Sequence, residues 1–392
     1  MNQVVILSGL RTPMAGFQGK FAELSAPELG AAAISAVINH CKIESHTVGE
    51  VYFGNVVSAG VGQAPARQAS LQAGLPEAVP CTTVSKVCGS GMKAIMLASD
   101  SLVSGHIDTA VVGGMESMSN APYLLSKARA GFRLGHQPLT DSLFCDGLED
   151  ADSGRLMGVF GQETADRFGL TRKQMDDFAI ESLKRARVAT EQGFFKDEIA
   201  PVKVSSRKGT EVVDQDEQIA TAKPEKIPTL KPAFKSDGTV TAANSSSISD
   251  GAAALVLMNA DVADQKGLSP MAIIRGYVSH AQAPAEFTLA PSGAIGKLLE
   301  KVAWSVEDVD LFEINEAFAL VTMLAMQELG IDHAKVNVNG GACALGHPLG
   351  ASGARIVVTL VHALKRLGKK RGVASLCIGG GEATAIAIEM LE

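Results

Sequence analysis

A glycine-rich turn that feeds a helix, followed by an apolar strand that ends in further glycines, occurs twice in this chain. The first unit spans residues 88–114 and the second spans residues 346–381. The expected helices are 92–103 and 354–367, and the expected strands are 109–112 and 372–378. Two units of similar length and order indicate an internal duplication, so the fold should consist of two related halves.

Strands and helices also alternate around these units. Short apolar runs at 4–7 and 51–54 have no regular polar positions, and a helix starting at Ala26 and reaching Ile38 lies between them. Continuous apolar strands are typical of an α/β fold, in which helices cover both faces of a parallel sheet. Ligands bind such sheets at the carboxyl ends of the strands, and a site is expected there.

Residues 121–243 have a different character. Prolines interrupt the segment and charges are dense, and between Lys184 and Lys235 eleven lysines and arginines outnumber eight acidic residues although the chain as a whole is acidic. Thr171 predicts the N-cap of a helix that continues to Thr190. The segment is either a solvated helical excursion or a lid that meets an anionic ligand. The core pattern returns with the apolar run 249–258.

Size and charge narrow the class of protein. A chain of 392 residues predicts two or three domains. The net charge of −7 argues against binding to nucleic acid. Met1 leads directly into an apolar strand, and no apolar run approaches the length that crosses a bilayer. We therefore expect a cytoplasmic protein that does not enter the membrane.

The six cysteines are scattered, with no C-x-x-C pair and no His/Cys spacing typical of a metal site. Free thiols in a reducing compartment are expected, and no metal. Cys88 is the most informative of them, because it lies between the apolar run 81–87 and the helix expected from Met92. The backbone N–H groups of a helix start favour a thiolate, although a buried structural cysteine is the simpler interpretation.

Three further positions become candidates only in combination. His347 lies in a turn, Cys377 closes an apolar strand, and Asn315 follows the strand-like run 312–314. Taken singly, each has an ordinary interpretation, as a turn residue, a core cysteine and a helix N-cap. Together they fall at one predicted sheet edge with Cys88, which would supply a nucleophile, a base and a further acid/base. The glycines from Gly379 onward would offer backbone N–H groups to an oxyanion.

Five motifs, in order along essentially the whole chain, resemble those of the thiolase family. They are Val87-Cys88-Gly89-Ser90-Gly91, Gly113-Gly114-Met115-Glu116-Ser117-Met118-Ser119, Asn315-Glu316-Ala317-Phe318, Gly346-His347-Pro348-Leu349-Gly350-Ala351-Ser352-Gly353 and Cys377-Ile378-Gly379-Gly380-Gly381. The resemblance implies a thiolase-like fold of two duplicated βαβαβαββ halves, packed as a five-layered α-β-α-β-α core with an inserted loop domain. The halves would be residues 1–120 with 244–268 and residues 269–392, and the loop domain covering coenzyme A would be residues 121–243.

Within the family the sequence looks like the acetyl-CoA acetyltransferase (acetoacetyl-CoA thiolase) branch. The resemblance implies that Cys88 carries the acyl group as a thioester after His347 assists its deprotonation. Cys377 would then remove the α-proton of a second acetyl-CoA, and Asn315 would hold a water for the enolate oxygen. The backbone N–H groups of Cys88 and Gly379 would stabilise the tetrahedral intermediate. The same residues would cleave a 3-oxoacyl-CoA in the reverse direction.

The resemblance also implies a substrate tunnel and an assembly. Ser246 matches a serine that contacts the pantetheine arm, and five positions match the tunnel lining. These are Leu148, Met157, Phe234, Ala242 and Phe318. Coenzyme A and acetyl-CoA would be substrates, with no permanently bound cofactor. A homotetramer, a dimer of dimers, is expected from the family alone.

Three positions depart from the family pattern. Leu156 stands where many members that act on short acyl chains have a histidine, and Ala220 replaces an arginine near the nucleotide. Glu382 stands where an apolar residue is more usual. These departures leave open a 3-ketoacyl-CoA thiolase of broader chain length, acting in fatty-acid β-oxidation.

Other classes account for less of the sequence. Gly89-Ser90-Gly91-Met92-Lys93-Ala94 fits the G-x-G-x-x-A pattern of dinucleotide-binding proteins, but the next strand ends in glycines where that pattern needs an acidic residue. A non-catalytic acyl-CoA carrier would not require Cys88, Asn315, His347 and Cys377 together. A ketoacyl synthase would use a second histidine where this chain has Cys377.

Overall fold

The computed structural model describes residues 3–206 and 209–391, and residues 1–2 and 392 of the predicted halves lie outside it. The strands are β1 (Val4–Arg11), β2 (Ala15–Gly16), β3 (Glu50–Gly54), β4 (Cys81–Val84), β5 (Thr109–Ser117), β6 (Tyr123–Leu124), β7 (Thr140–Asp141), β8 (Val202–Ser206), β9 (Gly209–Val213), β10 (Ser249–Asn259), β11 (Ala272–Ala281), β12 (Leu311–Ile314), β13 (Arg371–Ile378) and β14 (Glu382–Met390). The helices are α1 (Ala26–Cys41), α2 (Pro65–Gln72), α3 (Ser90–Val103), α4 (Met157–Arg167), α5 (Arg172–Glu191), α6 (Glu217–Thr221), α7 (Ala260–Gln265), α8 (Ala290–Val302), α9 (Ala319–Leu329), α10 (Ala342–Leu345) and α11 (Leu349–Leu367).

One large sheet runs through the molecule in the order β12-β13-β14-β11-β1-β10-β5-β3-β4, with β2 attached to β10. The strand order on one side of the centre of the sheet resembles the order on the other side. From the centre outward the N-terminal half reads β1-β10-β5-β3-β4, and the C-terminal half reads β11-β14-β13-β12. In each half the first strand pairs with the last, which is the strand order expected of a duplicated unit.

The second half lacks one strand of the predicted βαβαβαββ pattern. Where β4 stands in the first half, the second half has only an isolated bridge between Phe312 and Val336. The expectation of a parallel sheet is also wrong in part. Parallel pairing joins β3 to β4, β3 to β5 and β12 to β13, whereas the pairs toward the centre are antiparallel. A continuous apolar run indicates only that a strand is buried on both faces. Central antiparallel strands such as β10 are buried in the same way, so the run does not distinguish parallel from antiparallel pairing.

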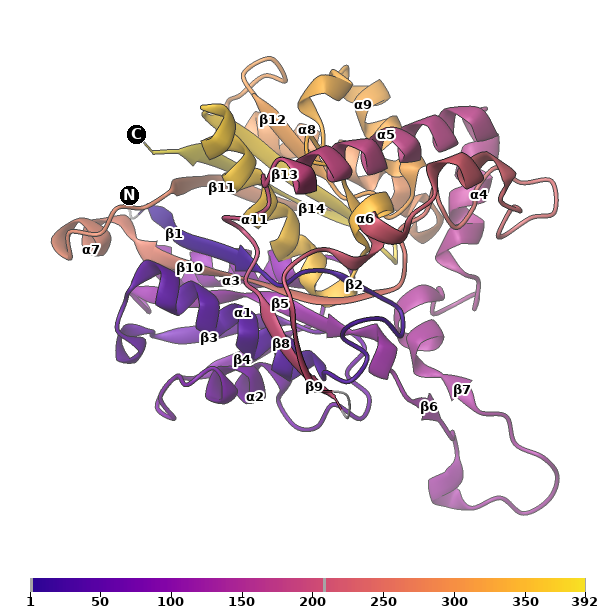
Figure 1. The fold of residues 1–392 in the computed structure, drawn as a ribbon, viewed down its shortest axis with the longest axis horizontal. Coiled ribbons are helices and arrows are strands. Elements are labelled where there is room, and N and C mark those ends of the chain that lie inside the picture. Colours follow the sequence, from indigo (N-terminus) through magenta and orange to yellow (C-terminus); the bar gives the residue numbers. More distant parts are fainter. Residues whose placement is uncertain (1–2, 207–208, 392) are drawn as a thin grey trace.

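Helices and sheet halves stack in five layers (Figure 1). Helices α1 and α2 cover the outer face of the first half, and α8 and α9 cover the second. Between the halves lie α3 and α11, and α11 contacts strands of both. Residues 349–364 of α11 are all buried, as expected of a helix with apolar neighbours on every side.

Glycines allow the two repeated turns to approach one another. A Cβ on Gly54, Gly91 or Gly114 would overlap the backbone carbonyl of Gly350, in the first turn of α11. The start of α11 therefore rests directly on the backbones of β3, α3 and β5. This contact brings the loop that precedes α11 close to the loop that precedes α3.

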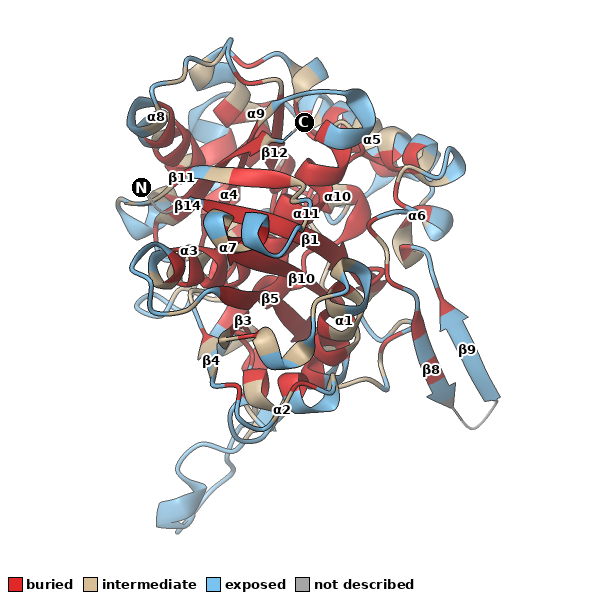
Figure 2. Cartoon of the chain, turned by 90° about the vertical axis from the view of Figure 1, so that its left-hand side faces the viewer, coloured by how far each residue is buried: buried red, intermediate tan, exposed pale blue. Residues whose placement is uncertain are grey.

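Residues 121–243 add hairpins and helices to this core. Thr171 caps α5 in a capping box with Gln174, as predicted. The segment around β6 and β7 projects from the body, and it is largely exposed (Figures 1 and 2). It carries exposed apolar side chains, among them Tyr123, Leu134 and Leu139.

A buried arginine connects this segment to the first strand. Arg11 of β1 contacts Glu198 through Nε at 2.6 Å and Asp216 through Nη1 at 2.7 Å, and all three side chains are shielded from solvent. The carboxylate of Glu198 also accepts a hydrogen bond from Thr359 of α11 at 3.1 Å. One guanidinium therefore joins β1 to two points of the 121–243 segment, and Glu198 joins it to α11.

We expect Arg11→Met to lower the free energy of unfolding by about 3–5 kcal/mol, because it leaves two buried carboxylates without their counter-charge. Thermal and urea unfolding followed by circular dichroism would measure the loss. Lys20→Met is the matched control, since Lys20 pairs with Glu211 on the surface and should leave the unfolding midpoint unchanged. Equal midpoints for the two variants would contradict a structural role for the buried group.

Candidate active site

A cavity of about 420 Å³ lies between the two sheet halves and the 121–243 segment. It brings together the residues predicted from the sequence, with the exception of Asn315, which lies behind its wall. Those that line it are Cys88, Leu148, Met157, Phe234, Ala242, Ser246, Phe318, His347, Cys377 and Gly379. The lining is mostly apolar side chains, and its polar members are His347, the two thiols and the serines at 245–247.

Cys88 lies in a short loop between β4 and α3. The helix begins at Ser90, two residues earlier than predicted, and Gly89 occupies the N-cap without a side-chain hydrogen bond. Burial raises the pKa of the Cys88 thiol to about 11, although the backbone N–H of Gly379 favours the thiolate. The lowering of this pKa that the helix start led us to expect is therefore wrong. The effect of desolvation is the larger of the two, so the Cys88 thiol is protonated at neutral pH.

The ring of His347 has one nitrogen that is free to accept a proton. Its Nδ1 contacts Ser352 Oγ at 2.5 Å, and this hydroxyl donates to the carbonyl of Pro348 at 2.8 Å. Since Ser352 has only one proton to donate, His347 Nδ1 carries a hydrogen and Nε2 has a free lone pair. Nε2 is buried and has no hydrogen-bond partner within residues 3–206 and 209–391. Burial, assisted by the charge of Arg355, lowers the pKa of His347 to about 3, so the ring is neutral at pH 7.

His347 differs from the prediction in its placement. It does not follow a regular strand, because the short helix α10 precedes it and the preceding strand position is reduced to the Val336 bridge. The loop that carries it is placed by the contact of Gly350 with the first half. The other candidates do follow strands: Asn315 follows β12, and Gly379 follows β13.

Asn315 is not a helix N-cap, because α9 begins only at Ala319 with Phe318 at the cap position. Its Oδ1 accepts a hydrogen bond from Arg355 at 3.1 Å, which turns Nδ2 toward His347 at 3.4 Å from Nδ1. Arg355 in turn lies 3.7 Å from the carboxylate of Glu313. The amide is thereby held in one orientation beside the imidazole.

Glu316 supports the wall behind the cavity. Its carboxylate accepts hydrogen bonds from Ser182 at 2.7 Å, Asn337 at 2.8 Å and the backbone N–H of Cys343 at 3.1 Å. Ser182 belongs to α5, Asn337 lies in the segment before α10, and Cys343 belongs to α10. Glu316 thus anchors the segment that leads to His347.

Cys377 is the last but one residue of β13 and is buried. Burial raises its pKa well above the usual range, and the nearby Cys88 adds to this effect. Its side chain packs in an apolar cluster with Phe287 and Phe318, as the core interpretation predicts, but it also lines the cavity. All six cysteines of the chain are free thiols.

Aromatic and aliphatic side chains form the rest of the cavity. Phe318 lies edge-on to Phe234, with ring centroids 6.3 Å apart, and the Phe234 ring covers Gly158 so closely that a Cβ there would overlap it. Leu156, one of the three departures from the family pattern, lines this cavity. An apolar side chain therefore occupies the position at which the family resemblance led us to expect a histidine. Ala220 is exposed on α6.

Sequence reasoning missed the residues that hold the candidates in place. Ser352 and Arg355 follow His347 by five and eight positions, and both belong to α11. Helical spacing places them on the side of the helix that faces His347, which was a usable signal. The contacts of Arg355 with Asn315 and Glu313 depend on strand pairing, which the sequence does not specify.

The geometry defines a class of enzyme. A buried thiol, a neutral imidazole with a free ring nitrogen, a second thiol and a backbone N–H directed at the first sulfur are the components of acyl transfer through a thioester. Within the described ranges, 3–206 and 209–391, no group of three or more His, Cys, Asp or Glu side chains is arranged to hold a metal ion.

Comparisons with known proteins identify the family. The model of the thiolase N-terminal domain matches residues 4–261, and that of the C-terminal domain matches residues 268–390. The chain is 49% identical to acetyl-CoA acetyltransferase 2 of Arabidopsis thaliana, covering 100% of this chain and 98% of that protein. It is 48% identical to acetyl-CoA acetyltransferase of Escherichia coli over the full length of both. The chain belongs to the thiolase family.

Solved structures agree. The crystal structure of Bacillus anthracis acetyl-CoA acetyltransferase superimposes with a TM-score of 0.97 at 41% identity, covering 100% of this chain and 99% of that one. The Acat5 thiolase of Ascaris suum in complex with coenzyme A gives a TM-score of 0.94 at 43% identity, covering 99% and 100%. The fold is therefore the thiolase fold, and the protein is an acyltransferase.

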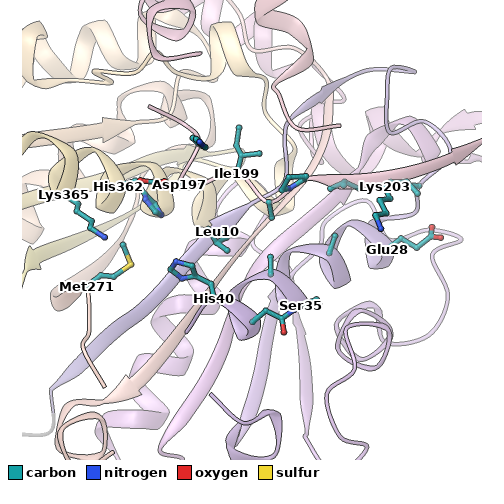
Figure 3. Close-up of a pocket in the computed structure, with 18 residues that line it drawn as sticks. Leu10, Glu28, Ser35, His40, Asp197, Ile199, Lys203, Met271, His362 and Lys365 are labelled. Atoms are coloured by element: carbon teal, nitrogen blue, oxygen red, sulfur yellow. Dashed lines mark hydrogen bonds between the residues drawn. The ribbon is translucent and has the colours of Figure 1, made fainter. Parts of the chain in front are cut away.

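A larger surface hollow of about 980 Å³ lies elsewhere, between α1, the end of α11 and the start of β8 (Figure 3). His40 and His362 face it, but each ring is already engaged, with Ser8 Oγ at 2.8 Å and with the carbonyl of Gly9 at 2.8 Å. Its charges are of both signs, and it has no residue in common with the cavity at Cys88. In the described part of the chain no helix is both long and apolar enough to cross a membrane.

Proposed function

We propose that this protein is an acetyl-CoA C-acetyltransferase, which condenses two acetyl-CoA into acetoacetyl-CoA and coenzyme A and catalyses the reverse thiolysis. The observation that carries the proposal is the free Nε2 of His347, which is buried in a cavity that two thiols, Cys88 and Cys377, also line. Relatives named acetyl-CoA acetyltransferase over their full length support this substrate.

In the first half-reaction His347 Nε2 takes the proton of Cys88, and the thiolate attacks the carbonyl carbon of acetyl-CoA. The thioester bond to coenzyme A breaks, and its thiolate leaves with a proton from Cys377. The products are acetyl-Cys88, free coenzyme A, a Cys377 thiolate and a protonated His347. The two opposite charges stabilise one another, which compensates for the burial that disfavours each ion in the resting site.

In the second half-reaction the Cys377 thiolate removes an α-proton from a second acetyl-CoA. The carbanion attacks the acetyl carbon on Cys88, a carbon–carbon bond forms, and the Cys88 thiolate leaves and takes the proton from His347. Cys88, Cys377 and His347 thereby regain their starting protonation states, and the α-proton has replaced the proton that left with coenzyme A. Thiolysis follows the same steps in reverse, since one site serves both directions.

Two groups of donors serve the negative oxygens. The backbone N–H groups of Cys88 and Gly379 bind the oxygen of the tetrahedral intermediate, and their role is supported by the contact of Gly379 with the Cys88 sulfur. The protonated His347 Nε2 and a water held by Asn315 bind the enolate oxygen. Arg355 supports this role because it orients the Asn315 amide.

The rest of the cavity accommodates the pantetheine arm, which passes Ser246 and the apolar residues Leu148, Met157, Phe234, Ala242 and Phe318. Residues 121–243 form the loop domain over coenzyme A, which acts as a substrate, and no cofactor stays bound between turnovers. The protein is a cytoplasmic homotetramer in this proposal. The exposed edge of β4 and the apolar projecting segment at 123–139 offer surfaces for contacts between copies.

Acylation tests this function directly. Incubating the protein with acetyl-CoA and mapping its peptides by mass spectrometry should locate one acetyl thioester, on Cys88, with release of one coenzyme A per site. Acetoacetyl-CoA should then accumulate with excess acetyl-CoA. An acetyl group on another cysteine, or none with acetyl-CoA but one with longer acyl-CoA, would contradict the proposed residue or the proposed substrate.

A further inference from the structure

Two loops from opposite halves of the sheet meet at the candidate nucleophile. One is the loop 86–89 between β4 and α3, and the other is the turn 379–381 between β13 and β14. A Cβ on Gly89 would overlap Ile378, and the N–H of Gly379 faces the Cys88 sulfur. Beyond this contact Lys86 forms an ion pair with Glu382.

These contacts succeed one another in antiparallel order, with 89 opposite 378, 88 opposite 379 and 86 opposite 382. The Cys88–Gly379 contact is therefore bounded by close packing on one side and by an ion pair on the other. Packing at Gly89 alone leaves the other end of the 86–89 loop free to move away from the turn. Lys86 and Glu382 close that end.

The 86–89 loop also has an unfavourable backbone conformation, which its neighbours must stabilise. Val87 has φ of 45°, in the left-handed region that a β-branched residue rarely adopts. Such conformations persist where surrounding contacts determine them. Ser90 Oγ accepts from the Lys86 N–H and donates to the Val87 carbonyl, both at 2.7 Å, and so holds the loop to its own helix. The ion pair holds it to the opposite half.

We propose that the Lys86–Glu382 ion pair is a clamp that fixes the Cys88 loop against the Gly379 turn and so sets the spacing of the backbone N–H groups of Cys88 and Gly379. This inference rests on the proposed function of those N–H groups as an oxyanion hole. Lys86 and Glu382 are positioning residues, since they act through the two loops.

The position of the pair predicts a small effect on stability and a larger effect on rate. The side chains of Lys86 and Glu382 are 22% and 35% exposed, so solvent and salt screen the pair in part. Losing one oxyanion donor costs about 10²–10³ in rate, and a displaced donor costs part of that.

The test uses Lys86→Met, Glu382→Gln and the exchanged pair Lys86→Glu with Glu382→Lys. Two rates are measured for Cys88 by peptide mapping: alkylation by iodoacetamide, which needs no turnover, and acetylation by acetyl-CoA. Glu389→Gln is the matched control, because Glu389 also lies on β14 and pairs with Arg275 far from the cavity.

Each single variant should alkylate Cys88 about fivefold more slowly, because the thiolate loses part of its hydrogen bond from Gly379. Acetylation should fall about tenfold, and the exchanged pair should recover to within about threefold of the wild-type protein. High salt should slow the wild-type protein and leave the single variants unchanged. The control should match the wild-type protein throughout.

The two readouts separate this inference from the proposed function. Unchanged alkylation of Cys88 in the single variants, or an exchanged pair no better than either single variant, would overturn the clamp. A response of alkylation to the variants, in a protein that acetyl-CoA does not acetylate, would retain the clamp and reject the proposed function.

Discussion

Cys88→Ala is expected to lower both condensation and thiolysis by roughly 10⁴–10⁶-fold, because removing a nucleophile that acts together with its base eliminates nearly the whole catalytic effect. No acetyl thioester should form on any cysteine. The rates would be followed by the absorbance of acetoacetyl-CoA, and the thioester by mass spectrometry of the intact protein. The fold should persist, since the side chain removed is small and borders a cavity.

Cys41→Ala provides the control. Cys41 is a free, partly buried thiol at the end of α1, on the outer layer of the first half. Its loss should change the rates by no more than about twofold. Substantial turnover in Cys88→Ala, or comparable losses in the two variants, would show that Cys88 is not the acyl carrier.

Motif spacing predicted the duplication, and the reason is physical. Glycines at 54, 91 and 114 are required because the backbone of Gly350 packs against them, so the interface between the halves leaves a mark in the sequence. The direction of a strand leaves no such mark in the sequence. A strand such as β10 is buried on both faces whether its neighbours run parallel or antiparallel, and the antiparallel centre of the sheet could not be predicted from its apolar run.

In the candidate site, too, some features could be predicted from the sequence and others could not. Cys88, His347 and Cys377 were recognisable because each stands beside glycines or at a strand end, and the cavity brings them together. The pKa of Cys88 was predicted in the wrong direction, because a sequence indicates the helix start but not how dry the site is. Arg355 and Glu382 were not recognised as supports, since their partners lie about 40 and 296 positions away in the chain.

Burial of the site explains why two thiols and an imidazole occur together. Burial disfavours both the thiolate of Cys88 and the imidazolium of His347, so neither ion forms readily alone. Transfer of a proton between them creates both ions at once, and their attraction is strong in a medium of low polarity. The resting site therefore holds neutral groups, and ions form when an acyl-CoA is in place to use them.

Cys377→Ala is expected to separate the two half-reactions. Acetylation of Cys88 should still reach full occupancy, at a rate lowered about tenfold, because protonated His347 can supply the proton that the leaving coenzyme A needs. Condensation should fall by about 10³-fold or more, and deuterium should no longer enter the methyl group of acetyl-CoA in D₂O, because no positioned base remains for the α-proton. Nuclear magnetic resonance of the recovered acetyl-CoA measures the exchange. Cys343→Ala is the control, because Cys343 is a half-buried thiol that packs against the same apolar cluster but does not line the cavity, and its loss should leave exchange intact. Full exchange in Cys377→Ala would assign the α-proton to another base, and a loss of acetylation as large as the loss of condensation would place Cys377 in the first half-reaction alone.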